Sequence, residues 1–454
     1  MGLKSGIFRE YDIRGLVGKE LDENTLELLG KGIGTYLAKT SGKKIVVGHD
    51  NRKTSPAFAQ SLANGLVSTG CQVTLVGLAT TPMVYFEVCN GNYDGGAIVT
   101  ASHNPPEFNG VKLTSKKAFP VFGEQLQKIQ KIIEKKEFVA GKGGLETKNI
   151  VDSYAWMLSE KIKLSKKIKV VVDTGNGVAG IIVPRVLRQW GVEVVELFTV
   201  LDDSFPNHLP DPTEEENMRE LSKKVAEEKA DLGLGFDGDC DRLGVVTKSG
   251  ELVFADKVLC VLALDFLKKH PRKKILADVK CSKLVQDVVE KNGGKLVWWK
   301  TGHSLIKSKM REEKILLAGE MSGHLFFADE FYGFDDALYA AGRLIRAIGN
   351  GGKLESLLES FPVYFNTPEI RIDCSEEKKD EIVQKVKNHF LEKYPLSVTI
   401  DGIRVIFPHG WGLVRKSNTQ AKLIMRFEAD SKKELEKIRV EVTGFLHSLL
   451  VPES

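Results

Sequence analysis

The amino-acid sequence predicts an α/β fold: three similar α/β domains with mixed, largely parallel sheets, followed by a C-terminal α+β domain. Three observations lead to this fold class. The chain has 454 residues, which is too many for one compact core. A strand–helix–strand pattern occurs three times, and this pattern implies parallel strands with helices packed over them. After residue 363 the pattern changes.

Each copy of the repeated pattern begins with a β-branched run that follows lysines and ends with a second apolar run. The first runs are KKIVVGHD (43–50), KIKVVVD (167–173) and KKILADV (273–279), and the second runs are CQVTLVGL (71–78), VEVVELF (192–198) and KLVWW (295–299). Helices are predicted between them over residues 56–69, 180–190 and 283–292. Three spaced copies indicate three domains of similar construction.

Turn-forming residues mark the expected domain boundaries. Residues 140–148 (AGKGGLETK) indicate a linker, and residues 248–250 indicate a hairpin turn between two apolar runs. The last segment predicts a strand over 367–373, a helix over 375–394, several strands over 398–427 and a helix over 431–450. We therefore expect domains at residues 1–148, 149–249, 250–363 and 364–454.

The composition excludes several classes of protein. The 65 basic and 61 acidic residues give a net charge of only +4, so nothing requires nucleic acid as a partner. Six scattered cysteines without a CxxC pair suit a reducing compartment. No run approaches the roughly 20 apolar residues of a membrane span, and the first 15 residues lack a signal-peptide core. We expect a cytoplasmic protein that binds neither membrane nor nucleic acid.

The segment TASHNPPEFNG (100–110) follows an apolar run that is typical of a buried strand end. Its two consecutive prolines force the chain to turn, because proline continues neither a strand ladder nor a helix interior. The turn holds Ser102 and His103 on a stiff loop, where the serine is a candidate nucleophile or phosphate carrier. A plain turn with a solvated hydroxyl explains this segment equally well.

The segment DGDCDR (237–242) places Asp237, Asp239 and Asp241 at alternating positions after a strand, so the three carboxylates lie on one side of an extended chain. Gly238 is expected to let the backbone curl so that they converge. Three carboxylates sharing a small volume need a cation at neutral pH, and an all-oxygen set suits Mg²⁺. An EF-hand is excluded, because Arg242 and Lys248 stand where that loop needs glycine and glutamate.

The segment GNGVAG (175–180) matches G-x-G-x-x-G between a strand and a helix, and Glu196 ends the next strand where a ribose-binding acid would lie. Taken alone, this pattern favours a nicotinamide-dependent oxidoreductase. The glycines serve equally well for a tight turn and close packing.

Three further segments carry polar groups that suit a sugar phosphate. In AGEMSGH (318–324), Glu320, Ser322 and His324 alternate and offer an acceptor, a hydroxyl and an imidazole on one face, although a core histidine is the simpler reading of His324. The segment RKSNT (415–419) suits a phosphate-binding loop, with an ordinary polar hairpin as the alternative. In KTGH (300–303), Gly302 allows close ligand approach and His303 is a candidate proton shuttle.

Taken together, TASHNPPEFNG, DGDCDR, GEMSGH and RKSNT, one in each expected domain, resemble the α-D-phosphohexomutase family over nearly the whole chain. FREYDIRG (8–15), KTGHS and GEMSGH are most similar to its bacterial phosphomannomutase/phosphoglucomutase branch. Ala101, before the serine, stands where many relatives have Gly or Ser, and Cys240, in the acidic loop, stands where Gly is common, but the reacting groups are intact.

The resemblance implies four domains around a central cleft and the reversible conversion of mannose and glucose 1-phosphates to 6-phosphates. It implies a phosphoserine at Ser102, one Mg²⁺ held by that phosphate and the three aspartates, and a hexose 1,6-bisphosphate that reorients in the cleft. Glucose 1,6-bisphosphate is the expected activator, and a monomer or weak dimer the expected state. Within the family, the alternative function is that of a phosphoglucosamine mutase. A non-enzymatic alternative is a protein that binds sugar phosphates without catalysis.

The same resemblance assigns roles to individual residues. Arg14 and Lys112 become candidates for proton handling near Ser102, where a lysine with a lowered pKa would serve, and His103 orients the phosphoserine. The implied substrate-binding residues are Tyr11, Arg242, Lys280, Thr301, Gly302, His303, Glu320, Ser322, His324, Arg415, Ser417, Asn418 and Thr419.

Overall fold

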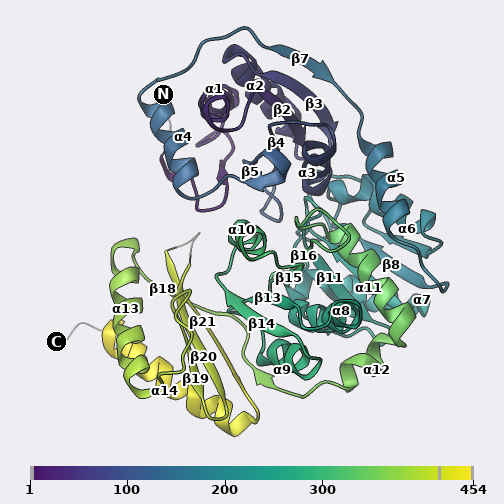
Figure 1. Cartoon of the computed structure of the whole chain (residues 1–454), viewed down its shortest axis with the longest axis vertical. Helices are drawn as coiled ribbons and strands as arrows, with labels where there is room; N and C mark the ends of the chain where they lie inside the picture. Colours follow the sequence, from purple (N-terminus) through teal and green to yellow (C-terminus); the bar gives the residue numbers. More distant parts are fainter. Residues whose placement is uncertain (1–4, 418–420, 451–454) are drawn as a thin grey trace.

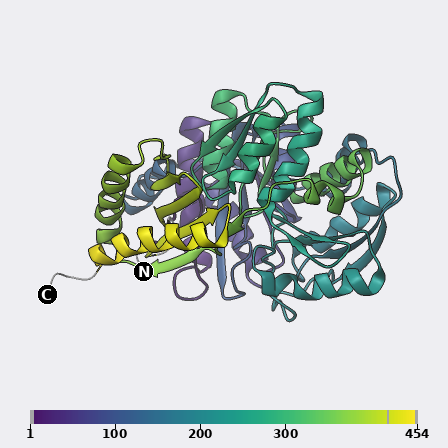
Figure 2. The same ribbon diagram turned by 90° about the horizontal axis from the view of Figure 1, so that it is seen from below.

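A computed structural model describes residues 5–417 and 421–450. Four sheets follow one another along the chain, and Figure 1 shows them as four lobes in an arc, from the purple N-terminal lobe to the yellow C-terminal one. Seen from below in Figure 2, the C-terminal lobe lies at one end of the molecule. None of the described helices combines the length and the hydropathy that a membrane crossing requires.

The first domain has a seven-stranded mixed sheet in the order β1-β5-β4-β2-β3-β7, with β6 on β5. Its central strands pair in parallel, and β1, β5 and β6 pair antiparallel. Residues 45–47 of β2 are all buried, so helices cover both faces of the sheet. The elements are η1 (Ser5–Ile7), β1 (Ile13–Leu16), α1 (Glu23–Thr40), β2 (Lys44–His49), α2 (Ser55–Ser68), β3 (Gln72–Leu78), α3 (Thr81–Asn90), β4 (Gly95–Val99), β5 (Phe108–Ser115), η2 (Lys116–Ala118), β6 (Phe119–Pro120), α4 (Glu124–Glu134) and β7 (Gly144–Thr147).

The predicted linker over residues 140–148 is wrong for its second half. Residues 144–147 form β7, which pairs in parallel with β3 and makes the edge of the sheet. The free edge of β3 offers unpaired backbone groups, and the short run Leu145-Glu146-Thr147 satisfies them.

The second domain has the sheet order β12-β11-β10-β8-β9, parallel from β10 to β9 and antiparallel beyond β10. The predicted hairpin turn near 248–250 is confirmed between β11 and β12. The helix predicted over 180–190 is divided into η3 and α6, because Pro184 lacks the N–H that a continuous helix needs. The elements are α5 (Val151–Lys161), β8 (Lys169–Asp173), η3 (Val178–Ile181), α6 (Val183–Gln189), β9 (Glu193–Leu197), η4 (Glu215–Met218), α7 (Arg219–Glu228), β10 (Leu232–Phe236), β11 (Leu243–Thr247) and β12 (Leu252–Val253).

The third domain has the sheet order β14-β13-β15-β16, with only the last pair antiparallel. Its buried side chains join those of the second domain, and some of the first, in one hydrophobic core. The elements are α8 (Ala255–Lys269), β13 (Lys274–Asp278), α9 (Lys283–Lys291), β14 (Lys295–Trp299), α10 (His303–Glu313), β15 (Leu317–Gly319), β16 (Leu325–Phe327), α11 (Ala337–Gly351) and α12 (Leu354–Glu359).

The fourth domain is the predicted α+β unit, with an entirely antiparallel sheet and a separate core. It joins the third domain through Arg404, whose guanidinium lies 4.1 Å from the Trp298 ring centroid and 3.7 Å from that of Trp411. Arg404 also donates to the carbonyl oxygens of Val279 and Cys281. The elements are β17 (Phe365–Asn366), β18 (Ile370–Asp373), α13 (Glu376–Lys393), β19 (Ile403–Phe407), β20 (Gly410–Lys416), β21 (Lys422–Ala429) and α14 (Lys432–Leu450).

Candidate functional site

The predicted serine loop lies between β4 and β5, at the end of the buried strand. Ser102 is 1% exposed and adopts a positive φ of 52°, which is uncommon for a residue with a side chain and frequent at functional sites. Its N–H donates to the Thr100 hydroxyl at 2.9 Å, and the N–H of Asn104 donates to the carbonyl of Ala101. The loop is therefore held by its own hydrogen bonds.

Arg52 fixes the same loop from outside, and the sequence analysis did not identify it. Its buried guanidinium donates to four carbonyl oxygens of the loop and of the strand after it, those of Ser102, Asn104, Pro105 and Phe108. Asp50 accepts the remaining Nε hydrogen. In the sequence, Arg52 is simply a basic residue shortly after a predicted strand, and such a position has no distinctive pattern.

The acidic loop follows β10 and meets the serine loop directly. Ser102 Oγ donates to Asp237 Oδ2 at 2.8 Å, and all three predicted aspartates are fully buried. Their carboxylate oxygens lie within 4.8 Å of one another. The predicted convergence of Asp237, Asp239 and Asp241 is therefore found in the structure.

The reason predicted for this convergence is wrong. Cys240, not Gly238, carries the positive φ that turns the loop, at 67°, and the Asp241 N–H closes the turn on Asp237. Gly238 instead permits close approach of the two loops, because a Cβ there would lie 2.2 Å from the carbonyl oxygen of Ser102.

Lys112 supplies the positive charge nearest to the acidic loop. Its Nζ lies 2.5 Å from Asp239 Oδ2 and 2.6 Å from Asp241 Oδ2. Burial alone would lower the pKa of Lys112, but these two carboxylates raise it well above its usual range. The expectation of a lowered lysine pKa is therefore wrong.

The three carboxyl groups differ in their electrostatics. Burial and the two neighbouring carboxylates raise the pKa of Asp237 well above its ordinary value. Burial works the same way on Asp241, but Lys112 and His324 outweigh it and lower that pKa. Asp239 Oδ1 and Asp241 Oδ1 are buried without a hydrogen-bond partner in the described part of the chain. Unpartnered carboxylate oxygens in an all-oxygen set fit a hard divalent cation such as Mg²⁺.

Two further polar side chains lie beside the serine loop. His103 Nδ1 lies 3.1 Å from Ser102 Oγ, and burial together with the Arg242 charge lowers the pKa of His103 well below its ordinary value. Arg14 reaches the loop indirectly, by donating to Asn104 Oδ1 at 2.6 Å. The structure thus places the predicted His103 and Arg14 at the serine loop.

Glu320, Ser322 and His324 lie in the turn between β15 and β16 rather than on one face of a strand, which corrects the expected alternation. The Glu320 N–H donates to the His324 carbonyl and closes this turn, and Ser322 is half-buried within it. Burial raises the pKa of Glu320 to about 7, and its Oε1 accepts a hydrogen bond from the Gly302 N–H.

His324 connects this turn to the acidic loop. Its Nε2 accepts from Arg242 Nε at 3.1 Å, and its Nδ1 lies 3.5 Å from Asp241 Oδ1. The ring stacks on that of His303 with centroids 5.2 Å apart.

Asp335 organises both imidazoles, and sequence reasoning missed it. Its Oδ2 lies 3.1 Å from His324 Nδ1 and 3.5 Å from His303 Nδ1, while Oδ1 pairs with Lys307 Nζ at 2.7 Å. Burial, followed by the Lys307 charge, lowers the pKa of His303 to about 4. The neighbouring Asp336 caps α11, so the pair of aspartates resembled a simple helix start.

Tyr11 and Thr301 close the wall beside His303. The Tyr11 hydroxyl donates to the Thr301 carbonyl at 2.7 Å. Gly302 is needed there because a Cβ would lie 2.4 Å from the Tyr11 ring. Asp401 accepts from the Thr301 N–H and from Arg415 Nε, which brings the fourth domain to this wall.

The predicted phosphate loop is only partly described. Arg415 belongs to strand β20 rather than to a loop, and its Nη2 is buried without a hydrogen-bond partner among the described residues. Ser417 follows the strand, and its N–H donates to the Lys422 carbonyl. Asn418 and Thr419 lie outside the described residues. Lys280 pairs with Glu369 at 3.3 Å, and its positive charge acts against the raised pKa of Glu320.

The dinucleotide pattern at 175–180 serves packing. A Cβ at Gly177 would lie 3.1 Å from the Cα of Gly238, and one at Gly180 would lie 2.1 Å from the Thr199 carbonyl. The Val178 N–H points to the Gly238 carbonyl. Glu196 is bound to Arg188 and Thr199. The turn therefore supports the acidic loop, as the packing interpretation of the glycines predicts.

Comparison with known proteins agrees with this geometry. Four family models match: phosphoglucomutase/phosphomannomutase alpha/beta/alpha domains I (5–140), II (151–250) and III (254–364), and the C-terminal domain (369–444). A phosphomannomutase/phosphoglucomutase of Pseudomonas aeruginosa is 42% identical over 438 residues, covering 96% of this chain and 94% of the relative. A phosphoglucomutase of Neisseria gonorrhoeae is 39% identical, with 97% of both chains covered.

Solved structures show the same relationship. A phosphoglucomutase/phosphomannomutase family protein of Burkholderia thailandensis superposes with a TM-score of 0.94 at 38% identity, covering 100% of this chain and 99% of that one. At 23% identity, a protein described as a putative phosphomannomutase of Thermus thermophilus shares the fold with a TM-score of 0.79, covering 99% of each chain. The chain belongs to the phosphoglucomutase/phosphomannomutase family.

Proposed function

We propose that this protein is an isomerase that interconverts hexose 1-phosphates and hexose 6-phosphates, with mannose and glucose as the sugars. The observation that carries the proposal is the hydrogen bond from Ser102 Oγ to Asp237, inside a buried set of three carboxylates. It places one hydroxyl where a phosphoryl group and a divalent cation would meet. Relatives named phosphomannomutase/phosphoglucomutase, at 42% identity, and relatives named phosphoglucomutase, at 38–39% identity, support this choice.

The reaction needs two phosphoryl transfers. In the first, the bond between phosphorus and Ser102 Oγ breaks and a bond forms to the free hydroxyl oxygen of the hexose phosphate. The hydroxyl gives up its proton and Ser102 Oγ takes one up, so the serine is again a hydroxyl. The product is a hexose 1,6-bisphosphate. After the sugar reverses its direction, its other phosphate returns to Ser102 and the remaining monophosphate departs.

We propose Mg²⁺ as the cation, held by Asp237, Asp239, Asp241 and the phosphate on Ser102. When bound, it offsets the charge of the transferring phosphoryl group. Lys112 adds a fixed positive charge at the same carboxylates, and its raised pKa keeps the ammonium protonated. His103, beside Ser102 Oγ, would orient the phosphoserine.

The residues from the other domains would bind the sugar in both directions. Glu320, Ser322 and His324 would contact the hydroxyl groups, and Arg415 would bind the distal phosphate through its unpartnered Nη2. Further phosphate contacts are assigned to Ser417, Asn418 and Thr419. The domains proposed for these roles are residues 1–148, 149–249, 250–363 and 364–454, and we propose a monomer or weak dimer as the state in solution.

A turnover assay with a sugar panel tests the proposal. The 1-phosphates of mannose, glucose and glucosamine would be supplied with Mg²⁺ and a trace of glucose 1,6-bisphosphate, which we propose as the activator that phosphorylates Ser102. Ser102→Ala is expected to abolish turnover of mannose and glucose 1-phosphates. Ser249→Ala, in an exposed turn, is the matched control and should leave turnover unchanged.

The outcomes separate the candidate functions. A strong preference for glucosamine 1-phosphate would make the protein a phosphoglucosamine mutase with the same mechanism. Turnover by Ser102→Ala at the wild-type rate would refute a phosphoryl carrier at this position. No turnover of any sugar, with phosphosugar binding intact, would favour a binding protein.

A further inference from the structure

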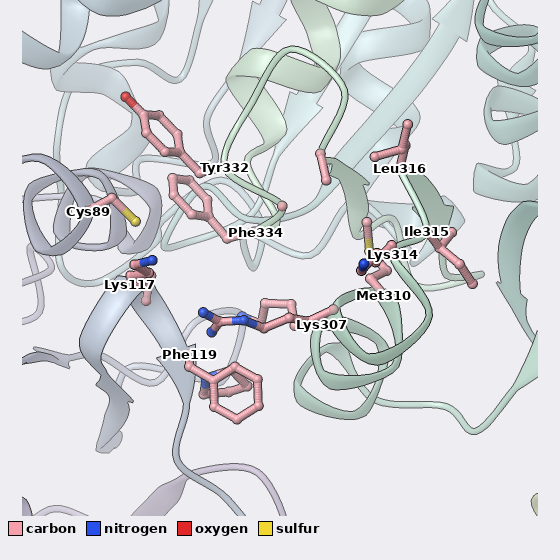
Figure 3. A pocket seen from close by; sticks show the side chains of 15 residues that line it. Cys89, Lys117, Phe119, Lys307, Met310, Lys314, Ile315, Leu316, Tyr332 and Phe334 are labelled. Carbon is pink, nitrogen blue, oxygen red and sulfur yellow. The ribbon is translucent and has the colours of Figure 1, made fainter. Parts of the chain in front are cut away.

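A pocket lies between the first and third domains, and none of the residues assigned to the proposed catalytic site lines it. Its volume is about 440 Å³, within the range of small-molecule sites. Figure 3 shows its two walls: Cys89, Lys117 and Phe119 come from the first domain, whereas Met310 and Lys314 come from α10 and the residue after it.

The pocket combines an apolar lining with unpaired positive charge. Lys117, Arg311 and Lys314 are exposed at its wall, and no carboxylate belongs to the lining. Within the described ranges, none of these three cations has an ion-pair partner. Neighbouring lysines outside the lining are paired with carboxylates. Lys309 pairs with Glu312 and Glu313, and Lys116 lies near Asp94.

Two of these cations, Arg311 and Lys117, act on groups that line the pocket. The Arg311 guanidinium lies 5.1 Å from the ring centroid of Phe119, across the domain boundary. Burial raises the pKa of Cys89 to about 11, and the charges of Arg311 and Lys117 both act against that shift. Cys89 therefore lies within the field of a cation from each domain.

The backbone also favours this arrangement. Lys117 and its neighbour Ala118 both adopt positive φ, at 59° and 54°, a costly conformation for two consecutive residues with side chains. Strain of this kind is frequent at binding sites, because the surrounding structure must maintain it.

We propose that this pocket is a second ligand site, for a small organic anion that carries an apolar ring. The anionic group would bind Lys117, Arg311 and Lys314, and the ring would pack on Phe119, Phe334 and the aliphatic lining. The site is separate from the catalytic one but adjoins it through Lys307, which lines the pocket and pairs with Asp335.

Fluorescence titration with 8-anilinonaphthalene-1-sulfonate tests the proposal, because this probe joins a sulfonate to aromatic rings. The titration would include saturating glucose 1-phosphate and Mg²⁺, so that the proposed catalytic site is filled. The test variant is Lys117→Gln/Arg311→Gln. The matched control is Lys116→Gln/Lys309→Gln, which removes the same charge from neighbouring positions outside the pocket lining.

We expect saturable binding by the wild-type protein and a dissociation constant at least about tenfold higher for the test variant, since it loses two charge-assisted contacts. The control should bind within about twofold of wild type. The uncharged probe N-phenyl-1-naphthylamine should bind more weakly than the sulfonate. Non-saturable binding, an equal loss in the control, or equal binding of the uncharged probe would each overturn the proposal. Sugar-phosphate turnover is measured separately and does not depend on this result.

Discussion

Gly238→Ala would separate the serine loop from the acidic loop without removing any reacting group. The new Cβ would lie 2.2 Å from the carbonyl oxygen of Ser102, whereas ordinary contact begins at 3.4 Å. The loops must therefore move apart by about 1.2 Å. The hydrogen bond of 2.8 Å from Ser102 Oγ to Asp237 cannot survive a shift of this size in that direction.

A misplacement of about 1 Å in a reacting geometry costs roughly 100-fold in rate, or about 2.7 kcal/mol of transition-state stabilisation. We expect kcat/KM for glucose 1-phosphate to fall by that factor, while the far-ultraviolet circular dichroism spectrum stays unchanged. Gly444→Ala is the matched control, because a Cβ at Gly444 on α14 meets nothing within 4 Å. A Gly238→Ala enzyme within threefold of wild type would refute the argument that the glycine sets the distance between the loops.

Three other outcomes follow from the site. Asp335→Asn leaves the Lys307 ammonium buried without its carboxylate, so the free energy of unfolding of the third domain should fall by about 3–5 kcal/mol. An unchanged thermal melting profile would contradict the role of this ion pair. The pKa of Glu320 in the folded protein is about 7, raised from 4.5, so its contribution to the free energy of unfolding is complete below pH 4.5 and falls by about 3 kcal/mol as the pH rises through 7. Glu320→Gln should remove this part of the pH dependence of stability, and an unaltered pH profile of the melting temperature would argue against the raised pKa. Chelation of divalent cations should stop turnover, and added Mg²⁺ should restore it. The Asp239→Asn variant should need at least about tenfold more Mg²⁺ for half-maximal activity than the wild type. An equal Mg²⁺ requirement would remove Asp239 from the proposed ligands.

The elements that the sequence predicted well are those whose signal is local. Apolar runs of β-branched residues identified β2, β8 and β13, because a strand covered on both faces is apolar at every position. Errors arose where tertiary contacts decide the outcome. Residues 144–147 become a strand only because β3 offers a free edge. Glu320 and His324 lie in a turn because β15 and β16 are each only three residues long.

The site residues also fall into those that local sequence could predict and those that it could not. The convergence of Asp237, Asp239 and Asp241 could be predicted because all three lie within one short segment. Asp335 and Arg52 could not, since each acts on residues distant in the chain and neither has a characteristic neighbour pattern. The raised pKa of Lys112 could not be predicted either, because the two carboxylates that raise it are 127 and 129 residues away in the sequence.

The contacts of Arg52 have a consequence for the whole catalytic cycle. The serine hydroxyl would gain and lose a doubly charged group in every turnover, yet Arg52 binds only main-chain carbonyls of the loop, and these do not change when the hydroxyl is modified. An arginine also keeps its charge throughout the physiological range. We therefore expect the backbone of the loop to keep the same shape whether or not Ser102 carries a phosphoryl group, so that the charge change in each transfer is met by ions, water and substrate.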